Sequence, residues 1–106
     1  MDGAPPRDGA DLLRTAAGRL EALAARTTPG DWRVAGLLAS RPEVVAHAPG
    51  GGTEHVAEAR AGTGAWIAAL SPALAAPLAA WLHAAAREPV DPAAEAFARA
   101  LLARLP

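Results

Sequence analysis

The feature that most constrains the fold is a long run without formal charge. No Asp, Glu, Lys or Arg occurs between Arg60 and Arg87, and most of the residues from Ala61 to Ala86 are alanine or glycine, with scattered leucine, isoleucine and tryptophan. Apolar surface of this extent is unfavourable in water. The run must therefore be covered by lipid, by the protein's own core or by another chain.

The run is long enough to span a bilayer, so the membrane alternative has to be weighed first. Pro72 and Pro77 interrupt it, and Ser71 and His83 are polar. Few large aliphatic side chains are present to drive insertion, and no cluster of basic residues flanks the run to set an orientation. We therefore expect protein contacts, not lipid, to cover it.

Composition excludes several other classes of protein. The chain has 106 residues and a net charge of -1, and its ten basic residues are arginines spread singly along the sequence. No basic patch is present to bind nucleic acid, and with no cysteine there is no disulfide or thiolate chemistry. The first residues lack the apolar segment of a signal peptide. We expect a disordered tail over residues 1–8, a single domain over 9–106 and a cytoplasmic location.

A first amphipathic helix is indicated after Asp8, whose carboxylate can cap free backbone donors. Apolar residues then recur at intervals of three and four and form one stripe, made up of Leu12, Leu13, Ala16, Leu20, Leu23, Ala24 and Thr27. Pro29-Gly30 ends the helix, because proline disfavours helical geometry in the residue before it and glycine turns freely.

A β-hairpin is predicted next. Trp32 and Val34 alternate with Arg33 in the run over 31–38, and a second short run to Ala48 contains the β-branched pair Val44-Val45. Ser40-Arg41-Pro42 supplies the turn. Residues 53–60 fit either a third strand or a single helical turn.

Helices are predicted for the rest of the chain. Thr63 is a candidate cap for a short helix, Ser71-Pro72 restarts the chain, and Asp91-Pro92 repeats that combination of cap and proline. Pro77 should kink the middle helix. The predicted fold is α+β: a hairpin or three-stranded antiparallel meander packed against about four helical segments.

Two segments resemble a known group of proteins. Residues 28–34, Thr-Pro-Gly-Asp-Trp-Arg-Val, resemble the "ATPGPW-x-V" opening of small actinobacterial and phage proteins of unknown function, among them a group of phage early proteins. Residues 64–73 and on to Leu78 resemble their later motif. Asp31 replaces the second proline and Gly64 an acidic residue. The resemblance implies an accessory, phage-like role and brings no catalytic residue or cofactor.

The chain has four large aromatic side chains, and we expect each to anchor either the core or a partner. They are Trp32, Trp66, Trp81 and Phe97. Trp32 is expected to be the first inward-facing strand residue, and the alternative is that it lines a ligand or partner surface.

Candidate chemistry is sparse. His47, His55 and Glu58 lie around the triple-glycine loop and could form a transition-metal or small-ligand site, which a weak hydrolase would use to activate water. Gly50-Gly51-Gly52-Thr53 could cradle an anion but lacks the lysine of a phosphate loop. His83 is expected at the edge of an apolar face. No serine or threonine has an evident base partner.

From these patterns we expect no catalytic residues, no metal and no cofactor. The preferred hypothesis is a non-catalytic protein–protein interaction module that binds a protein partner or forms a homodimer. The alternative is the small-ligand or metal-binding domain.

Overall fold

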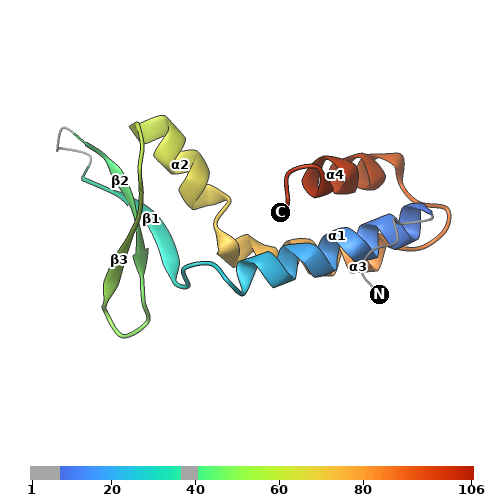
Figure 1. Ribbon diagram of the computed structural model, residues 1–106, viewed down its shortest axis with the longest axis horizontal. Helices are drawn as coiled ribbons and strands as arrows, with labels where there is room; N and C mark the ends of the chain where they lie inside the picture. Colours follow the sequence, from blue (N-terminus) through green and yellow to red (C-terminus); the bar gives the residue numbers. More distant parts are fainter. Residues whose placement is uncertain (1–7, 37–40) are drawn as a thin grey trace. The chain divides into compact units, whose positions relative to one another are not determined.

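A computed structural model describes residues 8–36 and 41–106 and has an α+β fold (Figure 1). The three strands pair antiparallel in the order β1-β2-β3, which confirms the predicted class and selects the meander over the simple hairpin. In chain order the elements are α1 (Gly9–Ala24), β1 (Asp31–Ala35), β2 (Glu43–His47), β3 (Thr53–Glu58), α2 (Ala61–Ala69), a 3-10 turn η1 (Pro72–Leu74), α3 (Ala75–Ala85) and α4 (Pro92–Leu102).

Contacts divide the chain into two compact units. The helical unit comprises the described residues up to Ala25 together with Ala75–Pro106, and the sheet unit comprises Arg26–Leu74. The single domain over 9–106 stays a prediction, because grouping by contacts does not show whether the two units unfold together. Of the tail expected over 1–8, residues 1–7 lie outside the described part of the chain.

The helical unit is built around α1. Leu13 and Ala16 of the predicted stripe have no exposed surface, nor does Ala17 beside them, and all three pack with Leu82 of α3 and Ala98 of α4. Small alanine side chains allow the helices to approach closely, so a modest number of leucines fills this core.

Two aspartates cap helices of this unit as predicted. The Asp8 carboxylate accepts a hydrogen bond from the Asp11 backbone N–H at 2.7 Å, and the Asp91 carboxylate accepts one from the Ala93 N–H at 3.3 Å. Each satisfies a backbone donor that has no partner within the helix.

In the sheet unit, α2 covers one face of the sheet. Trp32 lies opposite Ala46 and Val34 opposite Val44, so these four residues share a face. Val44 has no exposed surface, and Gly64 of α2 lies against it. A Cβ at Gly64 would be 3.5 Å from Val34 Cγ2 and 3.7 Å from Val44 Cγ2, which is ordinary van der Waals contact, so this position of α2 faces the two strands directly.

The tight turn before β1 follows the predicted Pro29-Gly30 pattern. Gly30 has φ of 111°, a conformation that favours glycine, and a Cβ there would be 2.8 Å from the His47 carbonyl oxygen. The hairpin between β1 and β2 is confirmed, although Ser40 of its predicted turn lies outside the described residues. Residues 53–58, left open between strand and helix, form β3.

Two predictions about helix starts and bends were wrong. Arg60, not Thr63, is the N-cap of α2, and it makes no side-chain cap hydrogen bond. Pro77 does not kink a helix interior, because α3 begins at Ala75 and Pro77 lies in its first turn, where a missing N–H costs no hydrogen bond. The break falls at Ser71-Pro72, where the Ser71 Oγ accepts a hydrogen bond from the Ala73 N–H at 3.4 Å.

Candidate interaction surface

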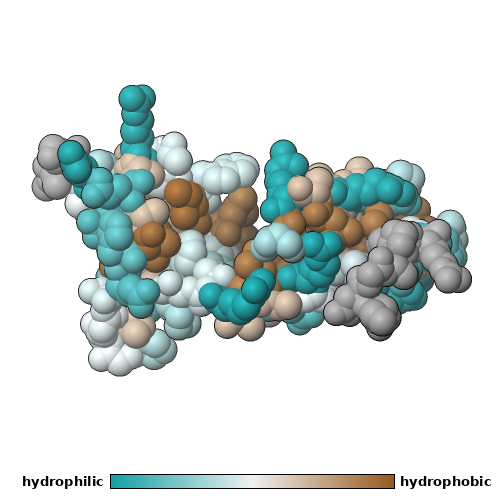
Figure 2. Space-filling view, in the orientation of Figure 1, coloured by the Kyte–Doolittle hydropathy of each residue, from teal (hydrophilic) through white to brown (hydrophobic). Residues whose placement is uncertain are grey.

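Much of the uncharged run is exposed. Trp66 is 69% exposed, Leu70 52% and Leu74 36% in the sheet unit, and Trp81 is 44% exposed in the helical unit. The sequence predicted that protein contacts cover this run, and the chain's own contacts supply that cover only in part. Figure 2 shows hydrophobic residues, in brown, at the surface of both units.

The exposed residues of α2 form a continuous strip, which we name the α2 outer face. Residues three and four apart share a side of a helix, and Gly64, Ile67 and Ala68 point to the sheet, as their lower exposure shows. The opposite side is exposed throughout and carries no charge. The α2 outer face consists of Gly62, Thr63, Ala65, Trp66, Ala69 and Leu70.

The helical unit has a second exposed aromatic group. The rings of Trp81 on α3 and Phe97 on α4 stack at a tilt, with centroids 5.5 Å apart and planes at 56°. Phe97 packs on the core of this unit, while Trp81 remains partly exposed. A stacked pair of this geometry stabilises the contact between the two helices and leaves an apolar surface outside it.

Trp32 is half-buried on the covered face of the sheet. Its indole N–H donates to the Thr28 carbonyl oxygen at 3.0 Å, which ties β1 to the segment that precedes it. Whether Trp32 anchors the core or lines a partner surface stays a prediction.

By length and composition, a helical segment among the described residues could cross a membrane. It spans Ala61–Ala85, has a mean hydropathy of 1.6 over its most apolar window, and 22% of that window is buried. A spanning arrangement would remove α2 from Val34 and Val44 of the sheet, and α3 from Leu13 of α1, leaving those residues without their present cover.

The structure gives no support to the alternative metal or ligand site, which stays a prediction. Among the described residues no group of three or more His, Asp or Glu side chains is placed to hold a metal ion. His55 and Glu58 lie on one extended strand, where three residues separate them by about 10 Å. His55 instead lies 3.7 Å from Glu43, and Glu58 lies 3.5 Å from Arg41.

The glycine loop shows no anion site either. The Gly51 N–H donates to the Ala48 carbonyl oxygen at 3.0 Å, and the Ala48 N–H donates to the Gly52 carbonyl oxygen at 2.8 Å. These amides close the β2–β3 turn. His83 lies at the surface of the helical unit as expected, 51% exposed, with its Nε2 3.6 Å from a Glu21 carboxylate oxygen.

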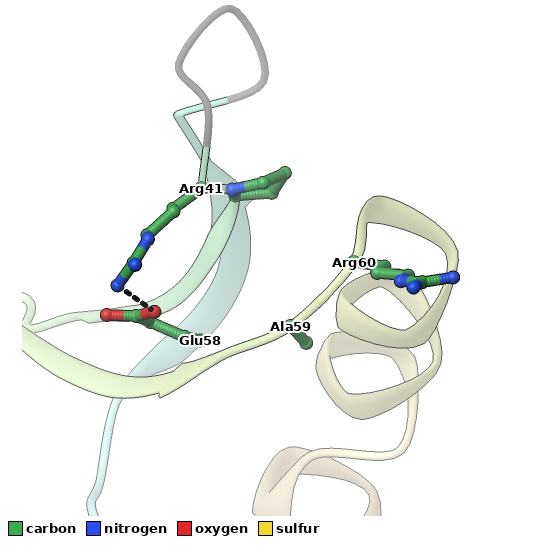
Figure 3. Close-up of a pocket in the computed structure, with 5 residues that line it drawn as sticks. Arg41, Glu58, Ala59 and Arg60 are labelled. Atoms are coloured by element: carbon green, nitrogen blue, oxygen red, sulfur yellow. Dashed lines mark hydrogen bonds and ion pairs between the residues drawn. The ribbon is translucent and has the colours of Figure 1, made fainter.

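A shallow cavity of about 290 Å³ is lined by Arg41, Pro42, Glu58, Ala59 and Arg60. Sequence patterns gave no signal for it, because its two arginines are far apart in the chain. Arg41 is paired with Glu58, and the Arg60 side chain points away from that pair (Figure 3). The two guanidinium groups therefore do not converge on a common ligand position.

Comparison with known proteins gives no information on the function of this chain. The chain matches no protein-family profile, and searches among curated proteins and solved structures also gave no match. The resemblance to small actinobacterial and phage proteins stays a prediction.

Proposed function

We propose that this chain is a non-catalytic protein–protein interaction module that binds through its exposed tryptophan surfaces. The observation that carries the proposal is the 69% exposure of Trp66, at the centre of an uncharged helix face. Tryptophan is enriched among residues that dominate binding energy, because it buries a large apolar area and keeps one polar group.

The charge distribution favours a protein partner over nucleic acid or lipid. The α2 outer face has no basic residue for a phosphate, whereas helices that lie on membranes carry lysine and arginine beside their apolar face. Protein interfaces, by contrast, are depleted of charge at their centre and enriched in aromatic residues.

Photo-crosslinking in the native host tests the proposal. A photoreactive amino acid replaces Trp66 in one variant and Trp81 in another, and Ala22, exposed on α1, serves as the matched control position. Ultraviolet light should produce protein adducts at position 66 or 81 that are absent at 22, identified by mass spectrometry. Adducts to lipid alone, or no adducts, would contradict the proposal.

Elemental analysis of protein purified without an affinity tag provides a second check. Stoichiometric transition metal, lost when His55 is replaced by alanine, would favour the ligand-binding alternative. The accessory role in a phage-like setting and the cytoplasmic location remain predictions from the sequence.

A further inference from the structure

We infer that the α2 outer face binds a second copy of this chain, with the two α2 helices antiparallel across a two-fold axis. This inference rests on the proposed interaction function and names its partner. Three observations support it. One side of α2 is exposed, large and small residues alternate on its outer face, and its only nearby charge lies at its N-terminal end.

The first observation is that α2 carries no charged side chain and is apolar apart from Thr63. A helix of this kind is normally covered all round, yet the sheet covers only the side that carries Gly64, Ile67 and Ala68. The other side bears Trp66 and Leu70, one turn apart and both more than half exposed. A second surface of matching character is required to remove them from water.

The α2 outer face is complementary to itself. Gly62 precedes Trp66 by one turn on the same side, and nothing lies within 4 Å of the position that a Gly62 Cβ would take. In an antiparallel pair whose axis passes level with Gly64, each Trp66 lies over the Gly62 of the other copy. Such a reciprocal contact is the defining property of a two-fold interface, and glycine and alanine permit the close approach.

Charge selects the antiparallel direction. The nearest charged residue is Arg60, the N-cap of α2. Parallel helices would bring the two Arg60 side chains together at the positive ends of both helix dipoles. Antiparallel helices place the arginines at opposite ends of the interface, with the positive end of each helix dipole beside the negative end of the other.

The area sets the strength of the association. A tryptophan and a leucine exposed to this degree present about 250 Å² per copy, or about 500 Å² for a pair, before the alanines are added. Stable interfaces bury about 1,200–2,000 Å² in total. The dimer should therefore be weak, with a Kd in the micromolar range or above.

The test compares two glycine-to-leucine variants by sedimentation velocity over a concentration series. Gly62→Leu places a side chain where the partner's Trp66 would lie, while the free chain has room for it. Gly18→Leu, at an exposed helical glycine of α1 that also has nothing within 4 Å, is the matched control. Both substitutions improve helix propensity, so a failure to fold is not expected, and circular dichroism verifies this.

We expect a monomer–dimer equilibrium in the native chain, an increase in Kd of at least about tenfold in Gly62→Leu, and no change in Gly18→Leu. A native chain that stays monomeric overturns the inference, as does a dimer that Gly62→Leu leaves intact. If Trp66 crosslinks to a different protein while the chain is monomeric, only the dimer fails. If Trp66 binds phosphatidylcholine vesicles and crosslinks to no protein, the proposed function fails as well.

Discussion

Three glycine-to-alanine substitutions separate the effects of backbone strain and steric clash in the sheet unit. Gly52 has no positive φ and nothing within 4 Å of an added Cβ. Gly51 has φ of 97° with the same open space, and Gly30 has φ of 111° with the His47 carbonyl oxygen 2.8 Å from the added carbon. From Gly52 to Gly51 the substitution adds backbone strain, and from Gly51 to Gly30 it adds a steric clash.

The expected changes in the free energy of unfolding follow from these geometries. Gly52→Ala should stabilise the sheet unit by up to about 1 kcal/mol, because alanine lowers the entropy of the unfolded chain. Gly51→Ala adds strain of about 1–3 kcal/mol and should be mildly destabilising. Gly30→Ala adds to that strain an overpacking cost of about 1–3 kcal/mol, because the β1–β2 backbone must shift, and should destabilise by about 2–4 kcal/mol net.

Urea unfolding followed at the Trp32 indole N–H signal provides the measurement, since this group donates to Thr28 in the folded sheet unit. The order of stability should be Gly52→Ala, then Gly51→Ala, then Gly30→Ala. If Gly30→Ala is no more harmful than Gly51→Ala, the close approach of Gly30 to the His47 carbonyl oxygen does not occur in solution. If all three variants are equal to the native chain, the turn conformations themselves are wrong.

Two further substitutions test the helical unit. Leu13→Ala removes a side chain with no exposed surface. It should lower the free energy of unfolding by about 2–5 kcal/mol, measured by thermal unfolding. A loss below about 1 kcal/mol would contradict the central position of α1. If residues 9–106 form one domain, Leu13→Ala should also shift the Trp32 unfolding midpoint, whereas a shift confined to helical circular dichroism would show two independently unfolding units. Asp91→Ala removes the α4 cap and should cost about 0.5–2 kcal/mol, with Asp91→Asn restoring most of it; equal losses in both variants would show that the side-chain oxygen does not cap the helix.

The local parts of the fold could be predicted because their causes are local. Asp8 and Asp91 cap helices through hydrogen bonds to residues two or three positions away. Pro29-Gly30 turns the chain through its own backbone conformation. Residues 53–58, in contrast, are a strand because β2 supplies their hydrogen-bonding partners, in a register with an irregularity between Val44 and Val45. No pattern within those six residues encodes that pairing.

The metal hypothesis gains no support from the described residues, for a related reason. His47, His55 and Glu58 are near one another along the chain, and proximity in sequence suggested a common site. His55 and Glu58 lie three positions apart on β3, which separates them by about 10 Å, and their partners are Glu43 and Arg41. His47 lies on β2, opposite Thr53. Whether nearby ligands converge depends on the secondary structure, which the sequence left open at that point.

The start of α2 does not follow the capping signal in the sequence. Thr63 has the side chain of a cap, yet the helix begins two residues earlier and places Gly64 against Val34 and Val44. A helix starting after Thr63 would have its N-terminal turn where this contact occurs. A side-chain cap contributes only about 1 kcal/mol, so the presence of a capping residue does not by itself decide where a helix begins.

The absence of charge proved a weaker guide to burial than the size of the side chains. Most of the run consists of alanine and glycine, whose exposure costs little, so a charge-free segment can remain half in water. Trp66 is different: its exposed part amounts to about 170 Å², which at 25 cal/mol per Å² corresponds to about 4 kcal/mol of unrealised burial. That quantity is concentrated in one side chain, and a partner that covers Trp66 gains more than one that covers the surrounding alanines. The functional argument therefore depends on Trp66 and the glycine one turn before it, and much less on the length of the run in which they lie.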